Sequence, residues 1–243
     1  MKRATGTGRI KRGFLFWTPV VAALLFASCS GRITGAVQTN EQGEFIIEAE
    51  LAPASARLLA PLSPATVSGQ SAPVLDAGVL ALSLRDAPGI ASAVLRNTNP
   101  GNIAGSIGFT KISDFLTAGD FRFITWELER AVIAIDRSNG PQMVTMLSRD
   151  ISDYLSAIMA PIATGEPLGK AEYLRLISSV YGNAIAREIE NAEVSATINF
   201  PGTVTMVQGG TYFGSTARFQ VKLADLLVLE QPLRYEVRWT LFR

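Results

Sequence analysis

The sequence predicts an α+β fold in which an antiparallel sheet carries an inserted two-helix hairpin on one face. Two regions, 33–51 and 193–241, alternate apolar and polar residues as strands do. Between them, residues 141–191 place apolar side chains three and four positions apart, the spacing of amphipathic helices. Strands, then helices, then strands favour antiparallel pairing, with the helices packed on one face of the sheet.

The first strands form a predicted N-terminal hairpin. Residues 33–39 and 44–51 are joined by a polar turn that ends at Gly43. Three glutamates, Glu44, Glu48 and Glu50, share one face of the second strand, opposite its apolar side chains. A cation site is one interpretation of this acidic face, and a solvated strand face is the simpler one.

The middle of the chain has weaker patterns. Residues 52–73 are rich in Pro, Ala and Ser, which predicts a loop with at most one helical turn near 56–60. The remaining expectations, in chain order, are short helices over 75–84 and 88–97, a strand over 103–112, a short helix over 113–117, and two strands or one bent strand over 121–135.

A helical hairpin is predicted over 141–191. Its helices, 141–160 and 169–191, each carry an apolar stripe, and the short linker 161–168 favours antiparallel packing. Apolar side chains of this hairpin are candidates for lining a ligand groove against the sheet, because Met repacks easily around different ligands. Core packing is the alternative for the same residues, which are Met143, Leu147, Leu155, Met159, Leu174 and Ile177.

The last third of the chain is the clearest β region. Gly209-Gly210 between two alternating segments is a typical two-residue hairpin connection. The final segment, 233–241, alternates almost without fault. The predicted strands are 193–200, 203–208, 211–223 and 233–241.

The N-terminus resembles an export signal that ends at a lipidated cysteine. Residues 2–12 hold five Lys or Arg and no acid, and 14–26 are almost wholly apolar but too short to span a bilayer. Phe26-Ala27-Ser28-Cys29 then predicts cleavage between Ser28 and Cys29, with a diacylglyceryl group on the new N-terminal thiol and palmitate-type acyl chains as membrane anchor. Residues 1–28 would be removed, leaving 29–243 as a single domain. An ordinary signal peptide, a retained anchor helix and a weakened twin-arginine signal are the alternatives.

Composition limits the chemistry of the domain. Beyond residue 28 there are 17 basic against 21 acidic residues, which argues against nucleic-acid binding. The chain has no histidine and one cysteine, so the usual general base, nucleophilic thiol and zinc ligands are missing. We expect no enzymatic activity, no cofactor and no metal site. The alternative is a hydrolase that uses the carboxylate pairs Glu127 and Glu129 or Asp150 and Asp153.

Several short motifs occur in the order found in one known family. They are the lipobox cysteine, the turn at Gly43, Ile107-Gly108-Phe109 leading into Ser113-Asp114-Phe115, Asn199-Phe200-Pro201-Gly202, Gly209-Gly210 and a terminal strand with Trp239. Together they resemble the LppM-like domain of bacterial envelope lipoproteins, with the 141–191 helices as an insertion. The resemblance implies an α+β domain on a membrane anchor that handles an envelope glycolipid or another hydrophobic ligand. It brings no catalytic residues.

The sequence therefore predicts a membrane-anchored lipoprotein of the cell envelope that binds a lipid, glycolipid or other hydrophobic ligand without catalysis. Its domain is expected outside the cytoplasm. The outer membrane is favoured because Ser30, rather than Asp, follows the cysteine. The alternative is a structural or assembly subunit that binds other envelope proteins.

Overall fold

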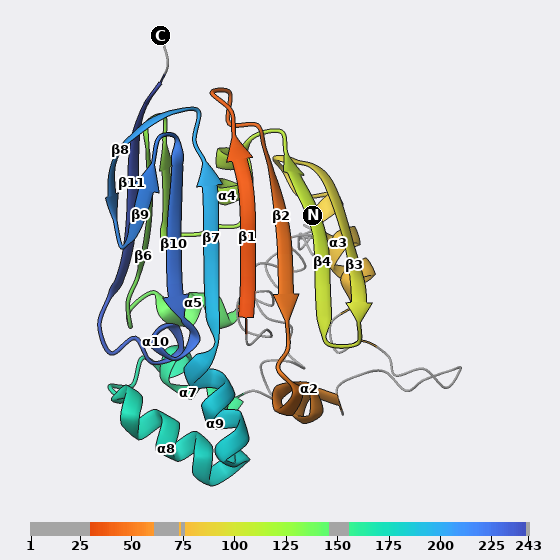
Figure 1. The fold of residues 1–243 in the computed structure, drawn as a ribbon, viewed down its shortest axis with the longest axis vertical. Helices are drawn as coiled ribbons and strands as arrows, with labels where there is room; N and C mark the ends of the chain where they lie inside the picture. Colours follow the sequence, from red (N-terminus) through yellow and green to blue (C-terminus); the bar gives the residue numbers. More distant parts are fainter. Residues whose placement is uncertain (1–29, 61–72, 74–75, 146–155, 242–243) are drawn as a thin grey trace, which may run out of the picture.

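The computed structural model describes residues 30–60, 73, 76–145 and 156–241, and it confirms the α+β class. Its strands form a seven-stranded mixed sheet and a four-stranded antiparallel sheet (Figure 1). The seven-stranded sheet has the order β3 (Ile90–Asn99), β4 (Asn102–Phe109), β2 (Gly43–Glu50), β1 (Ser30–Val37), β7 (Glu193–Asn199), β10 (Thr216–Lys222), β9 (Gly210–Phe213). The four-stranded sheet has the order β5 (Ile124–Glu127), β6 (Arg130–Ile135), β11 (Leu233–Leu241), β8 (Gly202–Gln208).

The N-terminal hairpin is confirmed. β1 and β2 pair antiparallel, with Ile33 opposite Ile47. The glutamate side chains of β2 are exposed, and Glu48 forms an ion pair of 3.3 Å with Arg32. No group of three His, Cys, Asp or Glu that could hold a metal ion occurs among the described residues. The acidic face of β2 is therefore a solvated strand face.

One strand pairing differs from the expected antiparallel arrangement. β1 pairs with β7 in parallel, with Ser30 beside Glu193 and Ala36 beside Asn199. The chain reaches β7 through helices that lie at the end of the sheet where β1 begins, so both strands start there and run the same way (Figure 1). Alternation of apolar and polar residues indicates a strand but not its direction, so the sequence could not show this.

The prediction of a helix over 88–97 is wrong, because most of this segment belongs to β3. Ala93 and Leu95 point into the core and Val94 points out, which is a strand alternation that pairs with β4 along its length. Gly89, at φ +79°, lies between the end of α3 (Ala77–Arg85) and the first residue of β3. A Cβ on Gly89 would come within 2.3 Å of the Lys111 carbonyl oxygen, so glycine is required there.

The other segments of the middle region follow the expectations more closely. The helix predicted over 75–84 is confirmed as α3. Its N-cap is Asp76, whose carboxylate accepts from the backbone N–H groups of Gly78 and Val79. In the described part of the predicted 52–73 loop, α2 (Pro53–Leu59) is longer than the single helical turn expected there. Residues 121–135 contain the two strands β5 and β6, and α4 (Ile112–Ala118) corresponds to the helix predicted over 113–117.

The predicted helical hairpin has a different shape. Residues 169–191 form two helices, α8 (Lys170–Tyr181) and α9 (Asn183–Asn191), because Gly182 adopts φ +91° between them. The described parts of 141–160 are α5 (Gly140–Thr145) and α7 (Ser156–Thr164), which continues past Ala160 through Pro161. These helices lie at one end of the seven-stranded sheet, with α8 outermost and α9 rising from it toward β7 (Figure 1).

The C-terminal strands are partly as predicted. β11 has the predicted bounds, but the hairpin predicted at Gly209-Gly210 is wrong, because β8 belongs to the four-stranded sheet and β9 to the seven-stranded sheet. The hairpin lies instead within 211–223, where β9 pairs with β10 and the chain turns at Gly214 with φ +60°. The helix α10 (Leu223–Val228) follows and was not predicted. Its apolar residues alone did not distinguish a short buried helix from the end of a strand.

Two clusters of buried side chains form the core. The larger one joins the helical end to the sheet and to α3. The smaller one lies between the two sheets and includes Phe200 and Trp239, whose rings stack at 4.7 Å, and Trp126, 5.7 Å from Trp239. Among the residues that the structure describes, no helix has the length and apolar character needed to cross a bilayer.

Candidate functional site

The residues predicted to line a ligand groove lie mainly in the core. Met143, Met159 and Ile177 are each 1% exposed and pack within the larger cluster. Leu174 is half-buried on α8 and lines a pocket. Leu147 and Leu155, and also Ser28 and Cys29, lie outside the described residues.

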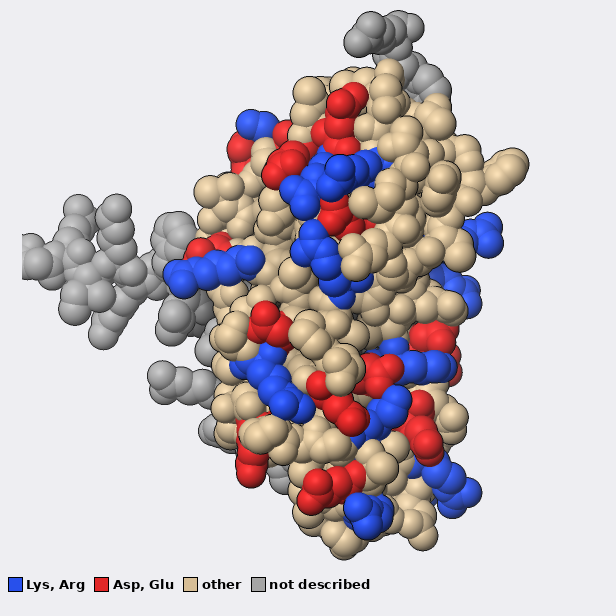
Figure 2. Space-filling model, turned by 90° about the vertical axis from the view of Figure 1, so that its left-hand side faces the viewer, with Lys and Arg blue, Asp and Glu red and all other residues tan. Residues whose placement is uncertain are grey.

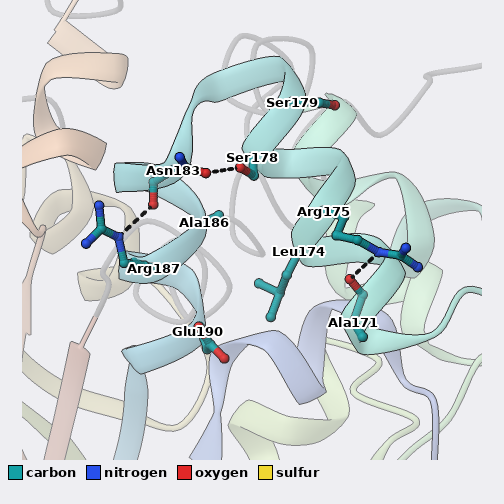
Figure 3. A pocket seen from close by; sticks show the side chains of 9 residues that line it. All are labelled: Ala171, Leu174, Arg175, Ser178, Ser179, Asn183, Ala186, Arg187 and Glu190. Carbon is teal, nitrogen blue, oxygen red and sulfur yellow. Dashed lines mark hydrogen bonds between the residues drawn. The ribbon is translucent and has the colours of Figure 1, made fainter.

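The pocket that Leu174 lines is a shallow hollow of about 620 Å³ between α8 and α9 (Figure 3). Its floor is apolar and its rim carries basic, acidic and hydroxyl groups. The hollow exists because Gly182 folds α9 back along α8. Its lining residues are Ala171, Leu174, Arg175, Ser178, Ser179, Asn183, Ala186, Arg187 and Glu190.

Two arginines dominate the polar rim. The Nε of Arg175 donates to the carbonyl of Ala171 at 3.4 Å, and the Nε of Arg187 donates to the carbonyl of Asn183 at 3.3 Å (Figure 3). Each of these hydrogen bonds joins an arginine to a carbonyl of its own helix, α8 for Arg175 and α9 for Arg187. The other N–H groups of each guanidinium remain open. Neither arginine forms an ion pair with a carboxylate in the part of the chain that the structure describes. The rim can therefore donate several hydrogen bonds to an anionic group.

α8 is held against the core by its buried face. Tyr173 is fully buried, and its hydroxyl donates to the carbonyl of Ile158 in α7 at 2.9 Å. Burial raises the pKa of Tyr173, so the phenol stays protonated and remains a donor. At the start of α8, the Nζ of Lys170 lies 2.7 Å from the Asp225 carboxylate, and this hydrogen bond raises the pKa of Lys170.

The first described residue lies at this same helical end. Ser30 begins β1, beside Glu50 on one side and Glu193 on the other. A second hollow of about 350 Å³ is lined by Ser30, Pro53 of α2 and Arg187 of α9, among others. Ser30 therefore lies next to residues of α2 and α9.

α2 and α9 are joined by one carboxylate. Glu188 accepts from the backbone N–H groups of Ala54 and Ser55, each at 2.8 Å, and from the Ser55 hydroxyl at 2.9 Å. These N–H groups belong to the first turn of α2, where no partner exists within the helix. Glu188 of α9 therefore caps the N-terminus of α2, and both helices line the second hollow.

A charged cluster on β11 was not selected from the sequence. The Glu236 side chain is 4% exposed and accepts from Arg130 and Arg238 at 2.9 Å and from Arg234 at 2.5 Å. These hydrogen bonds, led by that of Arg130, lower the pKa of Glu236 to about 2. Figure 2 shows basic side chains gathered around acidic ones over the strands on this side. The alternation Arg-x-Glu-x-Arg was the available signal, but it equally describes an ordinary solvent face.

Of the carboxylates considered for hydrolysis, the structure describes Glu127 and Glu129. Glu127 is exposed and lies 3.5 Å from Arg130. Glu129 accepts from the backbone N–H of Leu241 at 3.1 Å. Both carboxylates thus have structural partners, and Asp150 and Asp153 lie outside the described residues.

Comparison with known proteins gives one structural similarity. No protein-family model matches the chain, and no curated protein matches its sequence. Among solved structures, the chain is similar to the NMR structure of the folded domain of LppM from Mycobacterium tuberculosis, with 10% sequence identity and a TM-score of 0.38. The match covers 88% of this chain and 90% of that one. That structure is of an LppM domain, the type of domain that the turn motifs and the terminal strand of this sequence resemble.

Proposed function

We propose that the protein is a bacterial envelope lipoprotein, tethered through a diacylglyceryl group on Cys29, that binds a phosphate-bearing lipid or glycolipid in the pocket between α8 and α9. The observation that carries this proposal is the pair of open guanidiniums, Arg175 and Arg187, on the rim above the apolar Leu174. Arginine matches phosphate oxygens with paired hydrogen bonds, and an apolar floor suits the hydrocarbon next to a headgroup.

The position of the pocket supports the same ligand class. The pocket lies at the end of the domain where Ser30 begins β1. A lipid on Cys29 would hold this end close to the bilayer. A lipid headgroup would then be available to the pocket without the domain leaving the membrane.

Binding without catalysis fits the residues of the chain. The whole sequence contains no histidine, and its one cysteine is the proposed attachment point. The pocket rim offers arginines, serines, Asn183 and Glu190. Such a set can hold an anionic ligand, but it lacks a nucleophile paired with a base.

Lipid retention tests the proposed ligand class. The lipidated protein would be purified in mild detergent and analysed by native mass spectrometry for bound phosphate-bearing lipid. We expect the double variant Arg175→Gln and Arg187→Gln to retain such lipid about tenfold less or weaker still, since a hydrogen bond to a charged group contributes about 1.5–3 kcal/mol.

The matched control removes the same charge elsewhere. Arg96→Gln with Arg218→Gln changes two exposed arginines on β3 and β10, away from the pocket. This variant should retain lipid like the unchanged protein. Absence of bound lipid from the unchanged protein, or equal losses in the two double variants, would contradict the proposal.

The tether has a separate test. Cys29→Ala should leave the leader uncleaved at residue 28, and the mass of the diacylglyceryl group should be absent. The unchanged protein should show cleavage before Cys29 and carry that added mass in the membrane fraction. A cleaved Cys29→Ala protein that remains in the membrane fraction at the same level would contradict lipid attachment at this residue.

A second candidate function is a subunit of an envelope protein assembly. Its supporting observation is β9, an edge strand whose four residues are all exposed, including Phe213 at 91%. An open strand edge with apolar side chains can pair with another chain. Crosslinking in intact cells from position 213 would capture one partner in a fixed ratio if this function holds, and no discrete product if it does not.

A further inference from the structure

We infer that the outer face of α8 lies on the bilayer surface to which the protein is tethered, with Leu176 and Val180 in the boundary between headgroups and acyl chains. This inference rests on the proposed tether at Cys29 and adds the orientation of the domain. The occupant of this face is a phospholipid bilayer.

The first argument is the length of chain between the lipid and the fold. Ser30 is already paired with Glu50 and Glu193 at the start of β1. Consecutive Cα atoms are about 3.8 Å apart, so a lipid on Cys29 is held within one residue of a central strand. No linker residues remain to let the domain turn away, and the end of the sheet that carries Ser30 must stay near the membrane.

The second argument is which elements share that end. α9 leads into β7 at Glu193, beside Ser30, and Arg187 of α9 lines the same hollow as Ser30. Figure 1 shows α8 as the outermost element at this end, running obliquely across the direction of the strands. A helix in this position presents one long side to a surface below the domain.

The third argument is the exposed side of α8. Tyr173 and Ile177 are buried, whereas Leu176 is 48% exposed and Val180 is 59% exposed. Leu176 and Val180 are four residues apart and therefore lie on one face. An exposed aliphatic pair costs free energy in water, and this cost is relieved when the pair enters the acyl boundary.

The charges near this face fit phosphates. Arg175 is adjacent to Leu176 in sequence, and Arg187 lies on the opposite side of the pocket with its guanidinium directed away from Arg175 (Figure 3); each has open N–H groups. The acidic residues of α8 and α9 outside the cap of α2 are Glu172, in the first turn of α8, and Glu190, in the last turn of α9. The C-terminal half of α8, from Leu176 to Val180, is therefore the part expected to enter the bilayer.

Single cysteines can measure this orientation in the lipidated protein. Cys29 is the only cysteine of the chain, and its sulfur is consumed by the thioether. Val180→Cys then supplies the one free thiol for an environment-sensitive fluorophore. The control is Phe213→Cys, at the β9–β10 turn on the opposite end of the sheet, a site that is also apolar and 91% exposed.

The labelled proteins would be reconstituted in vesicles of phosphatidylethanolamine and phosphatidylglycerol that contain spin-labelled lipid. An interfacial helix buries its apolar face about 5–10 Å deep, so we expect a blue shift and a loss of about half of the emission at position 180. Position 213 should show neither change. Leu176→Glu in the Val180→Cys protein should abolish both effects, whereas Leu82→Glu, at an exposed leucine on α3, should not.

The failures are distinguishable. Equal emission at positions 180 and 213 in protein that floats with the vesicles overturns the orientation and leaves the tether standing. Protein that lacks the diacylglyceryl mass and does not float removes the tether and the orientation together. If Val180→Cys alters the far-ultraviolet circular dichroism, Leu176→Cys gives the same measurement one turn earlier on the same face.

Discussion

Replacing Tyr173 by phenylalanine tests how the pocket-bearing helix is held in place. The Tyr173 hydroxyl on α8 donates a hydrogen bond of 2.9 Å to the Ile158 carbonyl on α7. Tyr173 is completely buried. The substitution keeps the ring and removes one oxygen. It thus separates the hydrogen bond from the packing of the aromatic ring.

The expected cost follows from burial. Loss of one neutral hydrogen bond costs about 1 kcal/mol, and a carbonyl left without that donor in an apolar site raises the cost to about 1–2 kcal/mol. For a domain of this size, each kcal/mol lowers the melting temperature by about 2–4 °C, so the expected decrease is roughly 2–8 °C. The buried ring of Tyr173 should keep α8 helical at room temperature.

The assay is urea unfolding of the purified protein, followed by tryptophan fluorescence. Trp126 and Trp239 pack against Phe200 between the sheets, so their emission reports unfolding of the domain. The control is Tyr212→Phe, because this tyrosine is 48% exposed and its hydroxyl lies 3.4 Å from the Thr205 carbonyl. Equal midpoints for the two variants and the unchanged protein would refute the role assigned to the Tyr173 hydroxyl.

Three further predictions concern the charged cluster, the helix cap and a close backbone approach. The pKa of Glu236 is lowered to about 2 from 4.5, so its ionised form stabilises the fold above about pH 4.5, and this contribution is lost as the pH falls toward 2. The unchanged protein should therefore melt well above Glu236→Gln at pH 6, and this difference in melting temperature should shrink as the pH falls from 4.5 toward 2. Glu188→Ala should cost about 1–2 kcal/mol in urea unfolding by uncapping α2, whereas Glu190→Ala, on the same helix, should cost less than about 0.5 kcal/mol; equal costs would contradict the cap. Gly105→Ala should lower the melting temperature strongly, because its Cβ would lie 2.0 Å from the Val94 carbonyl oxygen in the β3–β4 pair, whereas Gly169→Ala meets no atom within 4 Å and should leave it unchanged; equal melting temperatures for these two variants would show that the sheet accommodates the added methyl group.

Local patterns were sufficient where one face of an element is buried and the other is solvated. β11 has the bounds expected from its alternation, and the β1–β2 hairpin has the expected partners. The same reasoning failed at β3, where Pro88 and short apolar residues fit a helix as well as a strand. Pairing with β4 decided the outcome there, and that partner is a long-range feature.

The candidate site was only partly predictable. Leu174 was selected for its apolar character, but Arg175 and Arg187 were not, since each reads as an ordinary exposed helix residue. They share a rim only because Gly182 turns α9 back along α8. Met143 and Ile177 satisfied the same sequence criterion as Leu174 and are buried in the core.

The sequence by itself determined the α+β class, most strand positions and the prediction of a lipid on Cys29, because periodicity and short motifs are local properties of a chain. The tertiary structure decided that β1 and β7 run parallel, that Glu236 is enclosed by three arginines, and that the start of β1 lies beside α9. The pairing of β1 with β7, the contact of Glu236 with Arg130 and the position of Ser30 beside α9 join residues more than 100 positions apart. No local pattern encodes such contacts, since their free energy exists only once the distant segments have packed together.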